Sequence, residues 1–410
     1  MAISNNCWEN KTFGQCAELV RNSCQPNEFS NMPYIGLEHI EEGTLRLSEL
    51  GNTNDVISTK SRFESGDILF GKLRPYFRKV IRPGFSGLCS TDIMVVRAKQ
   101  GIDQGFLFYW MASQEFVDTA TCGSEGTKMP RAKWDFLQRI EKPIPHLPEQ
   151  RAIAAILGAL DDKIDLNRQM NQTLEAMAQA LFKSWFVDFE PFRGESMDDS
   201  PLGPIPKGWE VAQIENLGDV ICGKTPPTRD ADNYEGHIPF ITIPDMHDNV
   251  FVTQTGGYLT ERGAKTQPKK LLPKHAVCVS CIATPGLVAL TSQPSHTNQQ
   301  INSIICNDSI SPFWCYLAMI NLRHEIITGG AGGSATLNLN KNEFSKLQAI
   351  KPSRAVMWKF YQIVEPFFSR ILSNELENIK LADIRDSLLP KLLSGEIRVK
   401  DAEKFMERAV

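Results

Sequence analysis

The clearest hydrophobic pattern in this chain is a heptad repeat that occurs twice. In each copy, mostly apolar residues recur at alternating spacings of four and three, the a and d pattern of a coiled-coil helix. The first series is Ile153, Leu157, Leu160, Ile164, Asn167, Asn171, Leu174, Ala178, Leu181 and Trp185. Adding 207 to each number gives Phe360, Val364, Phe367, Ile371, Asn374, Asn378, Leu381, Arg385, Leu388 and Leu392. Each series spans roughly 50 Å of helix at ~1.5 Å per residue, which suits a spacer between two domains.

Two asparagines stand at matching places in the two series. They are Asn167 and Asn171 in the first, and Asn374 and Asn378 in the second. A single asparagine in a helix is usually a surface residue. A polar side chain buried in a seam costs stability unless it meets a partner, so matched pairs favour a role in fixing the helix register. We expect the two helices to pair antiparallel, with Asn167 facing Asn378 and Asn171 facing Asn374.

Prolines interrupt the second heptad series. An interior proline removes a helical hydrogen bond, so we expect a bend at Pro366. In the run SLLPKLLSGE we expect Pro390 to end or bend the helix and Gly395 to close it.

The segments between the heptads repeat as well, with a period of about 207 residues, which indicates a duplicated domain. Each single match is weak, and the shared order carries the inference. The matches are Trp8-Glu9 with Trp209-Glu210, the strand-like Pro33–Ile35 with Pro239–Ile241, Ser65–Phe70 with Lys274–Val279, the apolar Phe106–Trp110 with Phe313–Leu317, and the Gly-Ser-rich GSEGTKMP from Gly123 with GGSATLNL from Gly332.

These patterns predict an α+β protein with a pseudo-two-fold internal repeat, in which two globular domains are separated by two long antiparallel coiled-coil helices. The linker between the halves is rich in Pro, Gly, Ser and Asp. The predicted boundaries are 1–148 for the first domain, 149–188 for the first spacer helix, 189–206 for the linker, 207–353 for the second domain, 354–394 for the second spacer helix and 395–410 for the C-terminal tail.

Composition fits this architecture. A chain of 410 residues exceeds one ordinary core, and 42% hydrophobic with 22% charged residues is typical of globular proteins. The longest apolar run, Ala152–Leu160, falls short of the ~18 residues of a membrane span, and the start MAISNNCWENK lacks a signal-peptide pattern. Ten cysteines without framework spacing favour reduced thiols. We therefore expect a cytoplasmic protein.

The net charge of −4 hides two basic clusters, one in each half. From Lys60 to Arg82 seven bases stand against two acids, and from Arg262 to Lys274 five bases stand against none, a local net of +5 in both. Such clusters are typical of surfaces that bind DNA phosphates, although a single basic residue is more often simply solvated.

The DNA-binding candidates fall into two chemical groups. Phosphate contacts, or guanine contacts for the arginines, are predicted for Lys72, Arg74, Arg78, Lys79, Arg82, Lys265, Lys269, Lys270 and Lys274. Loops after the apolar strands and the polar run Thr297–Gln300 add further candidates, because asparagine and glutamine can pair with adenine. These are Lys128, Arg131, Lys133, Asn298, Gln299, Asn338 and Asn340.

Catalytic alternatives fit poorly. GDVICGKT from Gly218 matches the phosphate-binding pattern G-x-x-x-x-G-K-[ST], but Pro226 and Pro227 follow where a helix must begin. Neither an (N/D)-P-P-(Y/F) methyltransferase segment nor a PD...(D/E)xK nuclease pattern is present, and the seven histidines form no HExxH. The one CxxC, Cys278 and Cys281, lacks a second ligand pair for zinc. We predict no catalytic residue and no metal site.

Three stretches together resemble the specificity subunit of type I restriction-modification systems. They are PIPHLPEQRAIAAILGALDDKIDLNRQMNQTLEAMAQALFKSWFVDFEPFRG from Pro143, PLGPIPKGWEV from Pro201 and RDSLLPKLLSGEIRV from Arg385. The resemblance implies a subunit without a catalytic centre. Its two target-recognition domains would each read one half of an asymmetric bipartite site in double-stranded DNA, and its helices would set the gap.

The resemblance also implies partners. Two modification (adenine methyltransferase) subunits would bind this chain, and restriction subunits would complete the enzyme. This subunit would hold no cofactor, whereas the partner subunits would use S-adenosylmethionine, ATP and magnesium.

One alternative stays open from the residues alone. The chain could be a non-enzymatic coiled-coil scaffold whose duplicated domains bind protein partners. The two basic clusters disfavour this alternative, and salt-dependent binding of mixed-sequence duplex DNA distinguishes the two functions.

Overall fold

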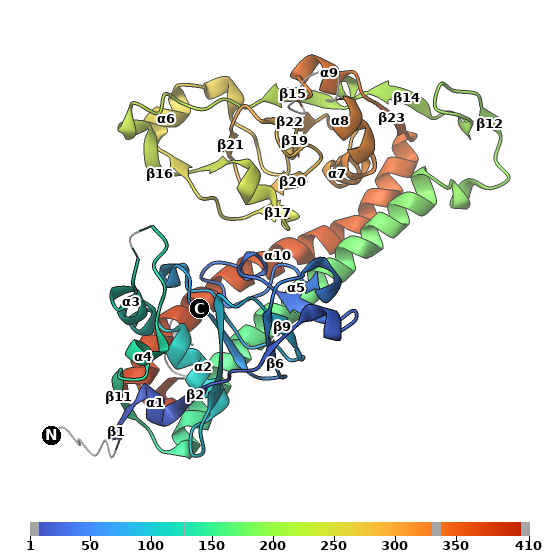
Figure 1. The fold of residues 1–410 in the computed structure, drawn as a ribbon. Helices are drawn as coiled ribbons and strands as arrows, with labels where there is room; N and C mark the ends of the chain where they lie inside the picture. The colour runs from blue at the N-terminus through green and yellow to red at the C-terminus, as the bar shows by residue number, and fades with distance from the viewer. Residues whose placement is uncertain (1–7, 127, 330–337, 403–410) are drawn as a thin grey trace. The chain divides into compact units, whose positions relative to one another are not determined.

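The computed structural model describes residues 8–126, 128–329 and 338–402 (Figure 1). The chain divides into two compact units. Unit 1 contains Met1–Ile164 and Lys380–Val410, and unit 2 contains Asp165–Ile379. Among the described residues, no helix is long and apolar enough to cross a membrane.

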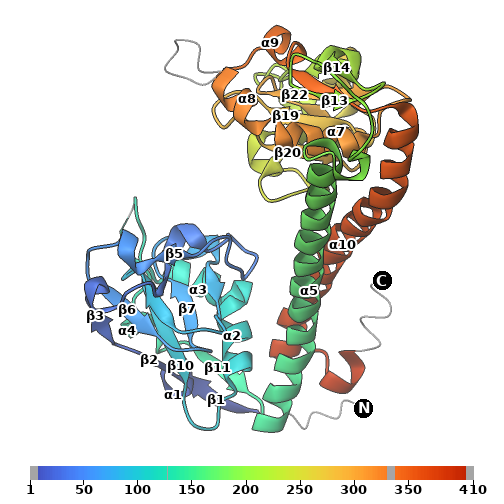
Figure 2. The same ribbon diagram turned by 90° about the vertical axis from the view of Figure 1, so that its right-hand side faces the viewer.

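Both heptad segments are long helices that pair antiparallel (Figure 2). Helix α5 spans Leu147–Phe186 and helix α10 spans Arg354–Ser394. In unit 2, Asn167 Nδ2 donates to Asn378 Oδ1 at 3.0 Å, and Asn374 Nδ2 donates to Asn171 Oδ1 at 2.8 Å. Rising numbers on one helix therefore meet falling numbers on the other. The α+β class with an antiparallel helix pair is confirmed, and the two asparagine contacts are those expected from the shared register.

Helix α10 is continuous through both prolines. Pro366 is exposed, while Val364 and Phe368 on either side of it are buried in the core of unit 2. Because packing on the seam face holds this turn, the loss of one backbone hydrogen bond does not interrupt the helix. The helix also continues four residues past Pro390, and Gly395, with φ of 76°, follows its last residue. Pro390 therefore does not end the helix.

The globular part of unit 1 is built on two sheets. The first is antiparallel and has the order β2 (Ala17–Leu19), β10 (Ile93–Ala98), β7 (Ile68–Gly71) and β8 (Val80–Ile81). The second has the order β3 (Ser23–Cys24), β6 (Lys60–Phe63), β9 (Gly87–Cys89), β4 (Pro33–Ile35) and β5 (Gly51–Asn52). A separate antiparallel pair, β1 (Glu9–Thr12) with β11 (Glu141–Ile144), leads into α5.

Unit 2 repeats this topology. Its first sheet has the order β15 (Gly218–Cys222), β22 (Ile301–Cys306), β19 (Val277–Ser280), β20 (Val288–Thr291) and the additional β17 (Phe251–Val252). The second contains β18 (Tyr258–Leu259), β16 (Tyr234–Ile241) and β21 (His296–Thr297). The pair β14 (Glu210–Gln213) with β23 (Gln348–Lys351) precedes α10. In both units the second sheet contains one parallel pair, β4 with β9 and β16 with β21, so the internal repeat extends to strand direction.

The matched apolar runs are helices, which the apolar pattern alone did not show. Phe106–Trp110 lies in α2 (Gln104–Ala112) and Phe313–Leu317 in α7 (Pro312–Asn321). Asp103 and Ser311 cap these helices, their side chains accepting from the N–H groups of residues three positions on. A helix buried on all sides shows no polar face, so its period cannot be told from that of a buried strand. Of the matched loops, GGSATLNL lies outside the described residues except for its last two, which are Asn338 and Leu339.

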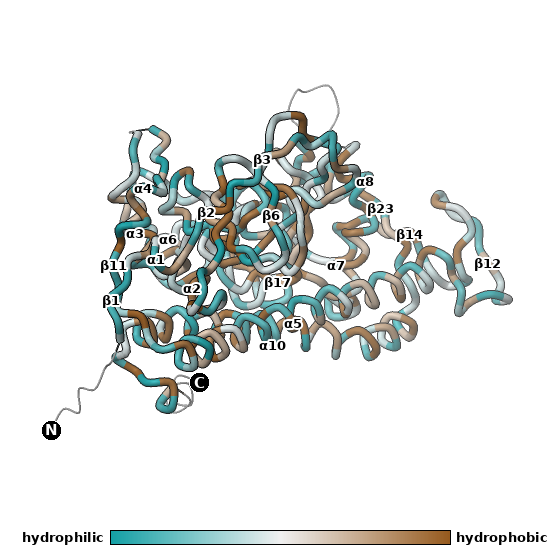
Figure 3. Tube along the Cα trace, turned by 60° about the horizontal axis from the view of Figure 1, so that its bottom comes forward, coloured by the Kyte–Doolittle hydropathy of each residue, from teal (hydrophilic) through white to brown (hydrophobic). Residues whose placement is uncertain are grey.

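The helix pair also supplies each core with apolar side chains, and hydrophobic and hydrophilic positions alternate along α5 and α10 in Figure 3. In unit 1, Leu157 and Leu388 pack with Trp110. In unit 2, Phe186, Phe360 and Trp209 form an aromatic cluster with ring centroids 4.8 to 5.7 Å apart. Each domain therefore shares its core with its own end of the helix pair.

Truncation of Asn167 tests the seam contacts. The side chain is fully buried and bonded to Asn378. Asn167→Ala leaves Asn378 unpaired, so we expect the free energy of unfolding to fall by about 1–3 kcal/mol in urea denaturation followed by circular dichroism. Asn167→Leu with Asn378→Leu should recover most of this loss. The exposed neighbour Gln172→Ala is the control, and a loss of the same size there would contradict the seam role.

The helix pair of unit 2 also buries a carboxyl group. Burial raises the pKa of Glu375 from its usual 4.5 to about 8. The negative charge of Glu175 adds to this increase, whereas hydrogen bonds from the backbone N–H groups of Phe251 and Val250 oppose it. One of its carboxyl oxygens is buried without a hydrogen-bond partner among the described residues. Glu375 is therefore neutral in the folded protein at pH 7, while it is ionised in the unfolded chain.

This difference predicts how stability depends on pH. Between about pH 4.5 and 8 the folded state holds a proton that the unfolded state has released, so the free energy of unfolding falls as pH rises. Glu375→Gln should remove this contribution and be more stable than the native chain at pH 8, measured by urea denaturation from pH 5 to 8.5. Gln362→Ala, at an exposed uncharged residue on the same helix, should leave the pH profile unchanged. A native-like profile for Glu375→Gln would refute the assignment.

Candidate nucleic-acid interface

Three turns meet at one end of the first sheet in unit 1. The turn after β7 is Lys72–Arg74, and it lies between the turn Ser90–Asp92 and the segment Pro130–Ala132. The Lys72 N–H donates to the Asp92 carbonyl at 2.9 Å, and the Ala132 N–H donates to the Lys72 carbonyl at 2.9 Å. The Arg74 N–H donates to the Pro130 carbonyl at 2.8 Å. We call these three joined segments the first three-turn edge.

Unit 2 builds the same edge from equivalent backbone. The Cys281 N–H donates to the Gln300 carbonyl at 2.9 Å, and the Leu339 N–H donates to the Cys281 carbonyl at 3.0 Å. An isolated bridge joins Ile282 to Asn338, as one joins Leu73 to Arg131 in unit 1. Both turns place a non-glycine residue in the left-handed region, Arg74 with φ of 51° and Ala283 with φ of 66°. The second three-turn edge is therefore Cys281–Ala283, Asn298–Gln300 and Asn338–Leu339.

The two edges carry different side chains. The first presents Lys72, Arg74 and Arg131, with Arg131 Nε bonded to Asp92 at 3.2 Å, and exposed Lys128 lies two residues before Pro130. The second presents Gln299 and Asn338, with Gln299 accepting from Thr225 Oγ1 at 2.7 Å, while Asn298 is buried beneath them. The same backbone thus supports a basic surface in one domain and an amide-rich surface in the other. Six of the predicted residues lie in these edges, and Lys128 lies next to the first edge along the chain.

The two basic clusters do not occupy equivalent places. Lys72–Arg82 follows β7, and its counterpart after β19 is 281–291, which contains no lysine or arginine. The lysines of the second cluster precede β19: Lys265 ends α6 (Glu261–Lys265), Lys269 and Lys270 lie in η9 (Pro268–Lys270), and Lys274 follows. Each half has one basic cluster, as its composition shows, but the two clusters lie at different places in the two domains.

Several predicted contacts have protein partners. Lys79 Nζ donates to the Leu37 carbonyl at 2.8 Å, Arg82 lies 5.6 Å from the centre of the Phe108 ring, and Lys133 pairs with Glu125. The Asn298 amide bonds to Gln300, and Asn340 caps α9 (Lys341–Ser345) in a capping box with Glu343. These contacts order the loops around the edges, so the side chains hold local structure whatever else they bind.

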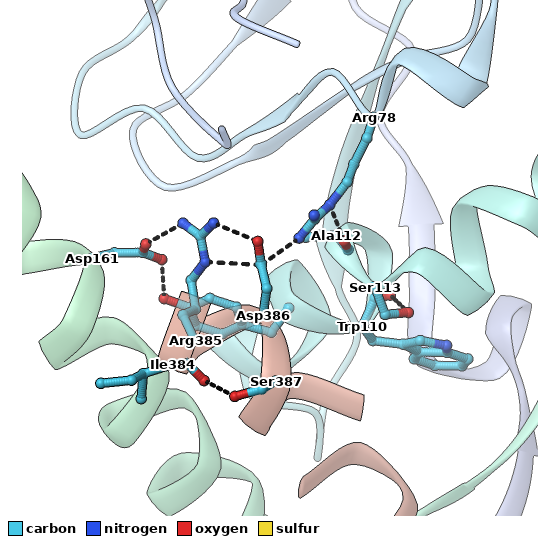
Figure 4. Close-up of polar contacts among 10 residues, drawn as sticks. Arg78, Trp110, Ala112, Ser113, Asp161, Ile384, Arg385, Asp386 and Ser387 are labelled. Carbon is cyan, nitrogen blue, oxygen red and sulfur yellow. Dashed lines mark hydrogen bonds and ion pairs between the residues drawn. The ribbon is translucent and has the colours of Figure 1, made fainter. Parts of the chain in front are cut away.

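Arg78 belongs to a network that joins the first domain to both long helices (Figure 4). Its Nη2 donates to Asp386 at 3.1 Å and its Nε to the Ala112 carbonyl at 2.7 Å. Arg385 donates to Asp161 at 2.7 Å and to Asp386 at 3.2 Å, and the Tyr109 hydroxyl donates to Asp161 at 2.7 Å.

Electrostatics within the network follow from burial and pairing. Burial, with the charge and hydrogen bond of Asp161, raises the pKa of Tyr109. Burial alone would raise the pKa of Asp386, but hydrogen bonds and charge from Arg385, helped by Arg78, outweigh it and lower the pKa. Asp386 therefore stays ionised.

Sequence reasoning singled out Arg385 only as a seam position. An arginine in an apolar seam is the signal that a buried acid must face it.

The phosphate-binding pattern GDVICGKT does not form a P-loop. Its first part is strand β15, and the next helical segment, η7 (Ala231–Asn233), begins six residues after Thr225. A Cβ on Gly223 would lie 2.1 Å from the Asn298 carbonyl and 2.3 Å from Thr297 Oγ1. Gly223 is thus required for close packing against the second edge, not for a phosphate.

Cys278 lies on β19, and Cys281 follows that strand directly. Burial raises the pKa of Cys278 to about 12 although Ser303 donates a hydrogen bond to its sulfur. The thiol is therefore neutral, whereas zinc binds the thiolate.

A family model and two curated relatives all match this chain to the same kind of protein. The model of the type I restriction modification DNA specificity domain matches residues 6–176 and 206–381. The chain is 35% identical to the type I restriction enzyme HindI specificity subunit of Haemophilus influenzae, covering 95% of this chain and 99% of that one. It is 29% identical to the MjaIX specificity subunit of Methanocaldococcus jannaschii, covering 74% and 71%.

Among solved structures, the type I restriction-modification S subunit from M. genitalium is similar in fold. The TM-score is 0.58 at 16% identity, over 96% of this chain and 98% of that chain.

Asn340 offers a test of structural against contact roles at the second edge. Asn340→Ala removes the cap of α9, so we expect a loss of about 1 kcal/mol in thermal unfolding, and Asn340→Ser should retain most of the stability. Asn338→Ala, two residues away and exposed, should leave stability unchanged. Equal losses for Asn338→Ala and Asn340→Ala would contradict the distinction.

Proposed function

Since this chain belongs to the family of type I restriction-modification DNA specificity subunits, which recognise DNA without catalysing a reaction, we propose that its two three-turn edges read the two halves of an asymmetric bipartite site. The observation that carries this proposal is the common backbone of the two edges. Equivalent turns in duplicated domains present different side chains, as two unlike half-sites require. Family membership also replaces the alternative of a scaffold that binds only proteins.

The first edge is suited to a negatively charged groove. Lys72 and Lys128 are phosphate contacts, because an ammonium group binds as a point charge. Arg74 and Arg131 present planar guanidinium groups, which can bond to both acceptors of a guanine in the major groove. The left-handed conformation of Arg74 directs the chain sharply through the turn after β7. Charge supplies affinity at this edge, and the arginines supply selectivity.

The second edge is suited to reading bases through neutral groups. Gln299 and Asn338 are exposed amides, which can pair with the donor and acceptor of adenine. Lys265, Lys269, Lys270 and Lys274 lie outside this edge and serve as phosphate contacts, which position a domain without reading sequence.

Helices α5 and α10 act as the spacer that sets the gap between half-sites, and the two asparagine pairs fix its register. We keep the six predicted segments, 1–148, 149–188, 189–206, 207–353, 354–394 and 395–410, as the functional division of the chain. Asn167 pairs with Asn378, and Asn171 pairs with Asn374. The 207-residue repeat relates Asn167 to Asn374 and Asn171 to Asn378, so it converts each asparagine pair into the other. The helix pair therefore presents two equivalent surfaces.

Two equivalent surfaces support two modification subunits per chain, with restriction subunits added in the full complex. S-adenosylmethionine, ATP and magnesium would act in those partner subunits, and the assembly would work on DNA in the cytoplasm.

Independent change of the two half-sites tests this function. The recognised sequence is first found by methylation-sensitive sequencing of a host that carries this chain and its partner subunits. In the purified complex with the methyltransferase subunit, Lys72→Gln with Arg74→Gln should relax selectivity in one half-site only. Gln299→Ala with Asn338→Ala should do so in the other half. Removal of one base contact should weaken binding about 5- to 150-fold, from ~1–3 kcal/mol per contact.

Salt dependence separates phosphate from base contacts in the same assay. Lys72→Gln with Arg74→Gln should make the negative slope of log K against log salt less steep by about 1 for each phosphate that the variant no longer neutralises. Gln299→Ala with Asn338→Ala should not change this slope. Lys207→Gln, exposed and outside both edges, is the control. The function would be refuted if the native complex bound no DNA at low salt. The assignment of the edges would be refuted if both variants affected the same half-site.

A further inference from the structure

We propose that the network of Tyr109, Asp161, Arg385, Asp386 and Arg78 locks the first domain on its end of the helix pair, with Arg78 as a positioning residue that helps to set the gap. This inference rests on the proposed function, because it concerns the separation at which two half-sites are read. It changes the role predicted for Arg78 from a DNA contact to a contact within the protein.

The lock joins three parts of unit 1 that are distant in sequence. Arg385 donates to Asp161, so it ties α10 to α5. The Tyr109 hydroxyl on α2 donates to the other oxygen of the same carboxylate. Arg78 reaches Asp386 from the turn before β8 and also holds the Ala112 carbonyl at the end of α2. The globular domain is thus attached by directional bonds at two points, one on each helix.

Burial makes these bonds selective for one geometry. The Arg385 side chain is 3% exposed and that of Arg78 is 14% exposed. A buried guanidinium is strongly destabilising unless its charge and its N–H groups are satisfied. Asp161 and Asp386 satisfy Arg385 from two sides. A small rotation of the domain on the helices would separate Arg78 from Asp386, so the network resists that rotation more than apolar contacts alone do.

The second half lacks this lock at equivalent positions. The 207-residue repeat places Phe368 at the position of Asp161, Ala178 at that of Arg385 and Gln179 at that of Asp386. The residue at the position of Arg78 is Gly286. Arg78 lies two positions before the first paired residue of β8, Gly286 lies two positions before that of β20, and both have a positive φ. Only the tyrosine is retained, and Tyr316 donates to Glu175 at 2.9 Å. Backbone N–H groups of Val250 and Phe251 bond to Glu375 on α10, and stacked rings such as Phe313 on Phe368 add apolar contact, so unit 2 is held by hydrogen bonds and rings without an arginine between two carboxylates.

Stacked rings slide with little loss of energy, whereas charge-assisted hydrogen bonds depend on direction. The first domain, which alone has arginine–carboxylate bonds at these positions, is therefore the more rigidly mounted one. Its orientation on the helix ends sets the position from which the gap is measured.

A double-mutant cycle on the full-length chain, in complex with its methyltransferase partner, tests the lock. The variants are Arg78→Met, Asp386→Ala and the two combined. Binding is measured on duplexes with the native gap, with the gap one base pair shorter or longer, and with changed bases in the first half-site. Each single variant should reduce discrimination between gap lengths by about tenfold, the equivalent of 1.4 kcal/mol, and the double variant should lose no more than either single one.

Base preference in the half-sites should stay native in all three variants. Gln179→Ala, at the position equivalent to Asp386 in the second half, is the matched control and should keep native discrimination between gap lengths. Thermal unfolding of each variant checks folding, and Arg78→Met is the milder change because Asp386 keeps its bond to Arg385.

Two results would overturn the inference while leaving the proposed function intact. One is native gap discrimination in Asp386→Ala. The other is that the losses of gap discrimination in the two single variants add in the double variant, while Arg78→Met alone changes the base preference. That result would show that Arg78 contacts DNA directly. If the native complex did not distinguish gap lengths or bind a bipartite site at all, the proposed function itself would fail.

Discussion

A polar side chain inside a helix pair must meet a polar partner, and this requirement determines how α5 and α10 pair. Asn167 with Asn378 and Asn171 with Asn374 can form these hydrogen bonds only in an antiparallel arrangement at one register. A shift of one turn would bury amides against apolar groups. Because each domain shares its core with one end of this helix pair, the register also determines where each domain is attached.

The duplicated domains separate support from readout. The backbone bonds that join the three turns are the same in both units, with the Lys72 and Cys281 amides in equivalent roles. Backbone groups must be paired wherever they are buried, so these bonds persist when side chains change. The exposed side chains carry no such requirement. A specificity subunit can therefore change the chemistry of an edge without changing the turn that presents it.

The two halves are nevertheless attached differently. Arg385 is buried between Asp161 and Asp386 in unit 1, and the equivalent positions in unit 2 are apolar or neutral. The asparagine pairs are compatible with the symmetry of the repeat, whereas the ion network breaks it. Unit 2 instead buries the neutral carboxyl of Glu375. The attachment of unit 1 thus includes charge-assisted bonds, whereas that of unit 2 combines stacked rings with hydrogen bonds to Glu175 and Glu375.

The sequence by itself determined the two long helices, their asparagine pairs and the duplicated order of segments, because heptad spacing and repeats are periodic properties that need no distant contact. It did not show that the apolar run Phe106–Trp110 is a helix, since a helix buried on all sides has no polar face. Tertiary structure alone decided that Lys72, Arg74 and Arg131 meet at one edge while Lys265–Lys274 lie before the equivalent strand. It also decided that Arg78 faces Asp386, 308 residues away. Such contacts depend on which strand ends and helix faces come together in space, and no local pattern encodes that.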